Sequence, residues 1–80
     1  MNNQEKLLKA AATVFGVDPA SLNDDSSQEN VPRWDSLAMV NLVAELEVAF
    51  EVQFDIMEIV DFHNIGIIKS ILAEKGIHFE

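Results

Sequence analysis

A serine stands between an acidic and an apolar residue near the middle of the chain, in the run Val31-Pro32-Arg33-Trp34-Asp35-Ser36-Leu37. The apolar spacing after it predicts a helix that begins at about Ser36. The first backbone N–H groups of a helix have no intrahelical acceptors, and they favour a nearby phosphate. A serine at such a junction is exposed to solvent and held by a rigid element, so it is suited to carrying a phosphodiester.

The same residues have a second interpretation. Asp and Ser are among the residues that helix N-caps prefer, because their side-chain oxygens accept hydrogen bonds from the first backbone N–H groups. Asp35-Ser36 can therefore simply start the helix. The two roles are compatible, since Asp35 can cap the helix while Ser36 points outward.

A hydrolase that uses Ser36 as its nucleophile is disfavoured. Such a serine normally needs an adjacent base, and neither His63 nor His78 lies near it in the sequence. We expect His63 in a solvated loop or capping position and His78 on the surface. No oxyanion loop or Gly-rich turn accompanies the serine. The chain has no cysteine and only these two histidines, so we expect no catalytic residue and no metal site.

Fourteen acidic residues against five basic ones give the 80-residue chain a formal net charge of −9. This charge disfavours nucleic acid and anionic membranes, which bind through Lys and Arg. It favours partners with basic surfaces, although the same acidity can simply keep a small protein soluble. No segment approaches the roughly 20 apolar residues that span a bilayer, and the N-terminus has no signal-peptide character. We expect one domain, residues 1–80, that is a cytoplasmic monomer without stable membrane insertion.

Helical spacing of apolar residues accounts for most of the chain, and no segment alternates cleanly as a strand would. The spacing predicts helices over about residues 3–15, 36–51, 56–62 and 65–75, with a long polar connection over residues 17–34. Connections of this length are uncommon in a compact domain unless they are functional. The expected fold is an all-α, four-helix bundle with a long first loop and a short third helix.

Residues with known capping roles mark the ends of these helices. Gly16 is expected to end the first helix, because glycine enters the left-handed region without a steric penalty. Asp55 and Asn64 are natural N-caps for the third and fourth helices. Leu22 and Val31 are the apolar residues that we expect to pin the long connection to the core.

The second predicted helix is apolar on two faces. Its core stripe consists of Leu42, Val43, Leu46, Ala49 and Phe50. A second apolar set falls toward another side of the helix: Leu37, Val40, Ala44 and Val48. Such a helix is either surrounded by neighbours or presents apolar surface to a partner.

Asp35-Ser36-Leu37, at the start of this helix in an acidic four-helix chain of this length, resembles the acyl carrier protein family. The resemblance extends from about Glu5 to Gly76 and needs no gap between Leu42 and Leu72. It includes Gly16-Val17-Asp18 at the end of the first helix. Further positions that fit the family pattern are Val40, Leu42, Val43, Leu46, Glu47, Phe50, Phe54, Ile65 and Leu72. The tripeptide alone is weakly specific, whereas its place in this pattern is strongly specific.

The resemblance implies a carrier and not an enzyme. In this family a separate, Mg²⁺-dependent transferase moves a 4′-phosphopantetheine arm from coenzyme A onto the motif serine, which here is Ser36. The terminal thiol of the arm then holds acyl intermediates as thioesters for fatty-acid, polyketide or other specialised biosynthesis. Since a partner enzyme supplies the activation, Ser36 needs exposure and no base of its own.

The resemblance also implies a surface that meets the transferase and the acyl-processing enzymes. The corresponding residues are Asp35, Leu37, Val40, Glu47 and Glu58. The acids would pair with Arg or Lys, while Leu37 and Val40 would fill a small apolar recess. Val40 can equally be partly buried between helices.

Some residues depart from the well-known fatty-acid members of the family. Ala38, Asn41, Ala44 and Val48 stand at positions that are often acidic or larger there, which weakens the expectation of a general fatty-acid role. Trp34 replaces a small residue, as in some polyketide, peptide and D-alanyl carriers, although it can also pack against Met39 as a hydrophobic staple. The alternatives are thus a peptidyl or aminoacyl (D-alanyl-type) carrier, and an interaction module that keeps the carrier fold unmodified.

Overall fold

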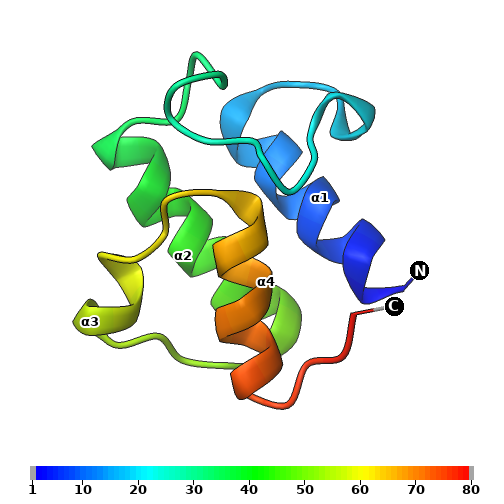
Figure 1. The fold of residues 1–80 in the computed structure, drawn as a ribbon, viewed down its shortest axis with the longest axis vertical. Coiled ribbons are helices and arrows are strands. Elements are labelled where there is room, and N and C mark those ends of the chain that lie inside the picture. The colour runs from blue at the N-terminus through cyan, green and yellow to red at the C-terminus, as the bar shows by residue number, and fades with distance from the viewer. Residues whose placement is uncertain (1, 80) are drawn as a thin grey trace.

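The computed structural model describes residues 2–79, which form four α-helices and one short 3₁₀ turn. In chain order these are α1 (Asn3–Phe15), η1 (Pro19–Ser21), α2 (Ser36–Phe50), α3 (Ile56–Ile59) and α4 (Ile65–Glu74). Figure 1 shows α1, α2 and α4 gathered around a common centre, with α3 at one side and the long connection crossing the end where α2 begins. The all-α, four-helix fold expected from the sequence is confirmed.

The ends of α1 follow from its first and last residues. Asn2 is the N-cap, and its side-chain oxygen accepts a hydrogen bond of 2.8 Å from the backbone N–H of Glu5. Gly16 follows the helix with φ of 68°, and its N–H donates to the carbonyl of Ala12. The predicted glycine stop is therefore present. The chain then turns through η1, which is capped by Asp18.

The bounds of α2 agree with the prediction except at the last residue. Glu51 was expected inside the helix, but it adopts a left-handed conformation with φ of 54° directly after Phe50. Its N–H and that of Val52 both donate to the carbonyl of Glu47, which closes the helix end. A left-handed conformation is strained for a residue with a Cβ, so packing of the following segment must compensate for it.

The third helix is shorter than predicted. It covers only Ile56–Ile59, and the chain then bends through a turn in which the N–H of Phe62 donates to the carbonyl of Ile59. The bend carries Phe62 into the core, where its ring meets Phe54 edge-on at a centroid distance of 5.2 Å. A helix continued to residue 62 would lack this turn. The prediction of a helix over residues 56–62 was therefore wrong beyond Ile59.

The core lies between α1, α2 and α4. Its fully buried large side chains are Leu7, Phe15, Leu42, Leu46, Ile65, Ile68 and Leu72. The fourth helix ends at Glu74, one residue earlier than expected, and Asn64 caps its start by accepting a hydrogen bond from the N–H of Ile67. The β-branched residues of α4 thus form a helix because their apolar spacing matches the core.

The long connection is tied to the start of α4. The carbonyls of Ser26 and Asp24 accept hydrogen bonds from the N–H groups of Ile65 and Gly66, at 3.1 and 2.9 Å. The Asp24 carboxylate forms an ion pair of 2.6 Å with Lys69. Leu22 and Val31, predicted as its apolar pins, are both buried. The segment before α2 is therefore a fixed part of the fold.

Across residues 2–79, none of the helices combines the length and the apolar character needed to cross a bilayer.

Candidate functional site

Ser36 is the first residue of α2, and it is exposed to solvent. The residue before it, Asp35, is the N-cap: its carboxylate accepts a hydrogen bond of 2.8 Å from the N–H of Ala38, and its carbonyl accepts from the N–H of Met39. The capping role of Asp35 is therefore confirmed, and it is compatible with an exposed Ser36.

The first turn of α2 suits a bound phosphodiester. Within residues 2–79, the backbone N–H groups of Ser36 and Leu37 have no acceptor, as is usual at the start of a helix. Such N–H groups attract phosphate oxygens. An exposed serine beside two free N–H donors thus fits the root of a phosphopantetheine arm, whose phosphate lies next to the point of attachment.

An aromatic stack positions this site. The ring of Trp34 is buried and stacks on Phe15 at the end of α1, with a centroid distance of 4.8 Å and an interplanar angle of 22°. The backbone N–H of Trp34 also donates to the carbonyl of Val31, and Val31 is itself buried. The sequence suggested Met39 as the partner of Trp34, whereas the stacking partner is Phe15. Residues 31–35 are thus held against α1, so Ser36 is presented at a fixed place.

The stack leaves one polar group without a partner. The indole N–H of Trp34 finds no acceptor among residues 2–79 although it is buried. A buried donor without an acceptor costs about 1–3 kcal/mol. The Trp34 ring therefore stabilises the site through its packing area and its aromatic contact with Phe15. Its unpaired indole N–H offsets part of that stabilisation.

The five residues expected to meet partner enzymes fall into two groups. Asp35, Leu37 and Val40 are exposed, so they are accessible to a partner. Glu47 and Glu58 are only partly exposed, and both carboxylates already have partners within the chain. No local pattern indicates the contacts of Glu47 with Phe54 and of Glu58 with Lys75, because the proximity of these residues depends on the tertiary fold.

Glu47 and Glu58 both hold the segment around α3. A Glu47 carboxylate oxygen accepts a hydrogen bond of 2.9 Å from the N–H of Phe54. Glu58 and Asp55 form a reciprocal capping box at the start of α3, and Glu58 also pairs with Lys75 at 2.7 Å. The hydrogen bond from Lys75, followed by that from the backbone of Asp55, lowers the pKa of Glu58. These two acids therefore fix the position of α3.

Both histidines are exposed to solvent, as expected from the sequence. His63 is exposed in the connection before α4, where Asn64 provides the cap. His78 is exposed in the tail, and its carbonyl accepts a hydrogen bond from the side chain of Asn3. Within residues 2–79, no group of three or more His, Cys, Asp or Glu side chains is arranged to hold a metal ion.

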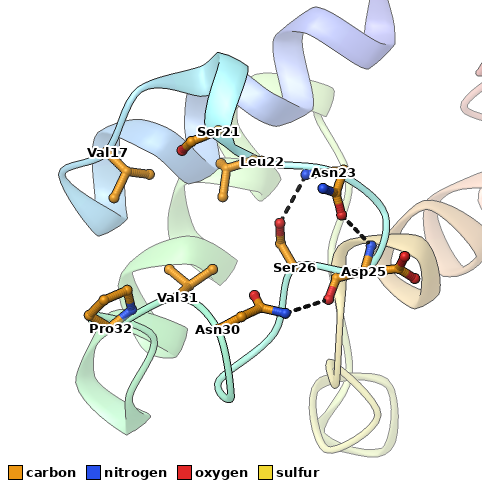
Figure 2. Close-up of a pocket in the computed structure, with 9 residues that line it drawn as sticks. All are labelled: Val17, Ser21, Leu22, Asn23, Asp25, Ser26, Asn30, Val31 and Pro32. Carbon is orange, nitrogen blue, oxygen red and sulfur yellow. Dashed lines mark hydrogen bonds between the residues drawn. The ribbon is translucent and has the colours of Figure 1, made fainter.

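A pocket of about 420 Å³ lies inside the long connection, and Figure 2 shows the side chains around it. Its polar groups bond to one another: the Ser26 hydroxyl accepts from the N–H of Asn23, and the Asn30 side chain donates to the carbonyl of Asp25. Ser36 does not line it. The lining residues are Val17, Ser21, Leu22, Asn23, Asp25, Ser26, Asn30, Val31 and Pro32. The pocket therefore belongs to the loop scaffold that precedes the site.

A family model described as a phosphopantetheine attachment site matches residues 5–69. The chain belongs to this family. As a member, it is a phosphopantetheine-bearing carrier protein of the acyl carrier type and not an enzyme, as its sequence predicted. Its prosthetic group is phosphopantetheine, and the family implies a transferase and acyl-processing enzymes as partners.

Solved structures of carrier proteins have the same fold. The holo acyl carrier protein NE2163 of Nitrosomonas europaea, solved by solution NMR, is 28% identical, with a TM-score of 0.79 over 98% of this chain and 100% of that one. A holo acyl carrier protein of Geobacter metallireducens is also 28% identical, with a TM-score of 0.75 over 100% of this chain and 97% of that one. A search of curated proteins by sequence gave no match. The likeness therefore supports the carrier class without selecting a pathway.

Proposed function

We propose that Ser36 is the residue that carries the 4′-phosphopantetheine arm, and that the arm holds acyl intermediates as thioesters for fatty-acid, polyketide or other specialised biosynthesis. One observation supports this assignment above the others: Ser36 is exposed at the start of α2, beside free backbone N–H groups, inside the region that matches the attachment-site family. Two holo acyl carrier proteins have the same fold, which supports a carrier of the acyl carrier type.

The chain's own residues would do three things for the arm. The Trp34–Phe15 stack would fix the root of the arm relative to α1. The N–H groups of Ser36 and Leu37 would bind its phosphate. Asp35, as the cap, would keep α2 intact up to the attachment point. When bound, the arm supplies a thiol that carries the acyl group as a thioester.

The assignment is tested by incubating the protein with a broad-specificity phosphopantetheinyl transferase, Mg²⁺ and coenzyme A, followed by intact mass measurement. We expect the wild-type protein to gain one arm and the Ser36→Ala variant to gain none. Ser70→Ala is the matched control, because Ser70 is also an exposed serine in a helix, and it should gain one arm as the wild type does.

Two results would contradict the proposal. If Ser36→Ala still gains an arm, another residue is the attachment point. If the wild-type protein gains none with several transferases, the chain is an unmodified interaction module that keeps the carrier fold.

A further inference from the structure

A groove of about 370 Å³ lies between the end of α1 and the first two turns of α2. We call it the α1–α2 groove. Asp35 and Leu37, the residues on either side of Ser36, both line it, so the groove opens beside the proposed attachment point. Its volume falls within the range of about 300–1,000 Å³ that is usual for sites of small molecules. The lining residues are Val14, Pro32, Arg33, Asp35, Leu37, Ala38 and Asn41.

The lining of the groove combines apolar and polar side chains. Val14, Pro32 and Leu37 offer apolar surface, whereas Arg33 and Asn41 offer exposed polar groups. The part of a phosphopantetheine arm next to its phosphate has the same mixture, with a pair of methyl groups, a hydroxyl and an amide. A side-chain amide such as that of Asn41 both donates and accepts hydrogen bonds, so it can pair with the hydroxyl and the amide of the arm.

Arg33 is the one cation among the residues that line the groove. Its side chain lies against Gly16 at the end of α1, where an added Cβ would meet a guanidinium nitrogen at 3.3 Å. The missing side chain of Gly16 therefore leaves room for Arg33 in this place. Within residues 2–79 the two ion pairs are Lys69–Asp24 and Lys75–Glu58, so the charge of Arg33 is not committed to a carboxylate. A guanidinium is permanently charged and suits phosphate oxygens.

The charge of the molecule makes this cation more important. The chain has a net charge of −9, and a phosphodiester would be repelled from most of its surface. Asp35 also lines the groove, but its carboxylate is engaged by the N–H of Ala38 at the start of the helix. Charge complementarity within the groove therefore places a phosphate toward Arg33.

The tether favours the chain's own arm over a free phosphorylated molecule. An exposed ion pair and one amide contact are individually weak, and they would hold a free ligand poorly. A group attached to Ser36 through a short flexible link has an effective concentration on the order of millimolar at an adjacent site. The same weak contacts are then sufficient, because attachment has already met most of the entropic cost of association.

We propose that the segment of the arm next to the phosphate lies in the α1–α2 groove, with the phosphate toward Arg33 and the neighbouring hydroxyl and amide toward Asn41. This inference rests on the proposed function of Ser36. Arg33 and Asn41 are then positioning residues: they direct the root of the arm toward α1 and leave its thiol end free to reach an enzyme.

The test is isotope-filtered NMR on the loaded protein, with a labelled chain and an unlabelled arm. We expect nuclear Overhauser effects between the paired methyl groups of the arm and the methyl groups of Val14. Val14 is decisive because it belongs to α1, whereas contacts to Leu37 would follow from attachment alone. The side-chain N–H signals of Arg33 and Asn41 should also shift when the arm is attached.

Substitutions on the two polar residues should loosen the arm without unfolding the protein. Arg33→Gln and Asn41→Ala should each weaken the arm–Val14 effects about twofold, as expected for the loss of one exposed polar contact. Arg33→Lys keeps the charge but not the planar group, so its effects should be intermediate. Lys9→Gln is the matched control, because Lys9 is an exposed cation of α1 outside the groove, and it should leave the effects unchanged.

The outcomes separate this inference from the proposed function. If the wild-type protein gains no arm, or gains it elsewhere than at Ser36, the proposed function fails and the groove inference fails with it. If Ser36 is loaded but the arm contacts α3 or no part of the chain, only the groove inference is overturned.

Two further results would also overturn the groove inference. Arm–Val14 effects of full intensity in both Arg33→Gln and Asn41→Ala would show that these residues do not position the arm. Shifts at Arg33 and Asn41 that are absent on loading, but appear when inorganic phosphate is added to the unloaded protein, would assign the groove to a free anion.

Discussion

Leu42 and Leu46 on the inner face of α2 are fully buried, whereas Leu37 and Val48 on the outer face of the same helix are mostly exposed. The four side chains have the same chemistry and differ only in angle around the helix axis. The inner pair stabilises the fold because its apolar surface is removed from water. The outer pair stays in contact with water in the free protein, so it does not stabilise the fold in this way. The difference teaches that one helix can supply both core and contact surface when its apolar positions fall on opposite sides.

The largest expected effect is on the inner face. Leu46→Ala should lower the free energy of unfolding by about 2–5 kcal/mol, since it removes buried methyl groups and leaves a cavity. The matched change on the outer face, Val48→Ala, should alter it by less than about 0.5 kcal/mol. Urea unfolding followed by circular dichroism measures both. Comparable losses of stability in the two variants would mean that the outer face also stabilises the fold, which would contradict the contrast between the two faces of α2.

A smaller effect on stability is expected at the start of α2, where Asp35 caps the helix that carries both faces. Asp35→Ala removes the side-chain oxygen that accepts from Ala38, and it should lower the free energy of unfolding by about 1 kcal/mol. Asp35→Asn keeps that acceptor and should be close to the wild type. Thermal or urea unfolding would check the pair, and an Asn variant as unstable as the Ala variant would show that charge and not capping is decisive.

The smallest effect concerns Glu58, the acid that caps α3 and pairs with Lys75. The pKa of Glu58 is lowered in the folded state, so its ionised form stabilises the fold above the ordinary carboxyl pKa, and this contribution is lost as the pH falls through the lowered pKa. Glu58→Gln keeps the capping box but removes the charge. The variant should be less stable than the wild type at pH 7, with the difference shrinking toward acid pH.

Lys75→Gln is the companion to this experiment, because it removes the partner of Glu58. The free energy of unfolding, measured with urea from pH 7 to acid pH, should fall less steeply on acidification in both variants than in the wild type. A pH profile that is identical in the wild type and in both variants would mean that the ion pair does not contribute to stability, and that the capping box and the hydrogen bond from Phe54 to Glu47 hold α3 without it.

Local signals in the sequence predicted most of the fold. The end of α1 followed from Gly16 and the start of α4 followed from Asn64, because each residue acts on the backbone of its neighbours. The start of α2 at Ser36 followed in the same way from Asp35. The early end of α3 was missed, because the bend that carries Phe62 inward depends on the core it enters.

The candidate site was predicted less completely than the fold. The exposed serine and its cap were local and were found. The stack of Trp34 on Phe15 joins residues 19 positions apart in the numbering, and no periodic pattern connects them. Glu47 and Glu58 were interpreted as free surface acids, because the sequence shows their charge but not the N–H of Phe54 or the ammonium of Lys75 that meets them.

The position of Trp34 has a practical consequence. The chain has one tryptophan, and it stands two residues before Ser36, with its ring enclosed against Phe15. Its ultraviolet emission therefore originates from one place only, at the root of α2. Attachment of a group to Ser36, release of a cargo or arrival of an enzyme can thus be followed in real time on the unlabelled protein, with the carrier serving as its own optical reporter.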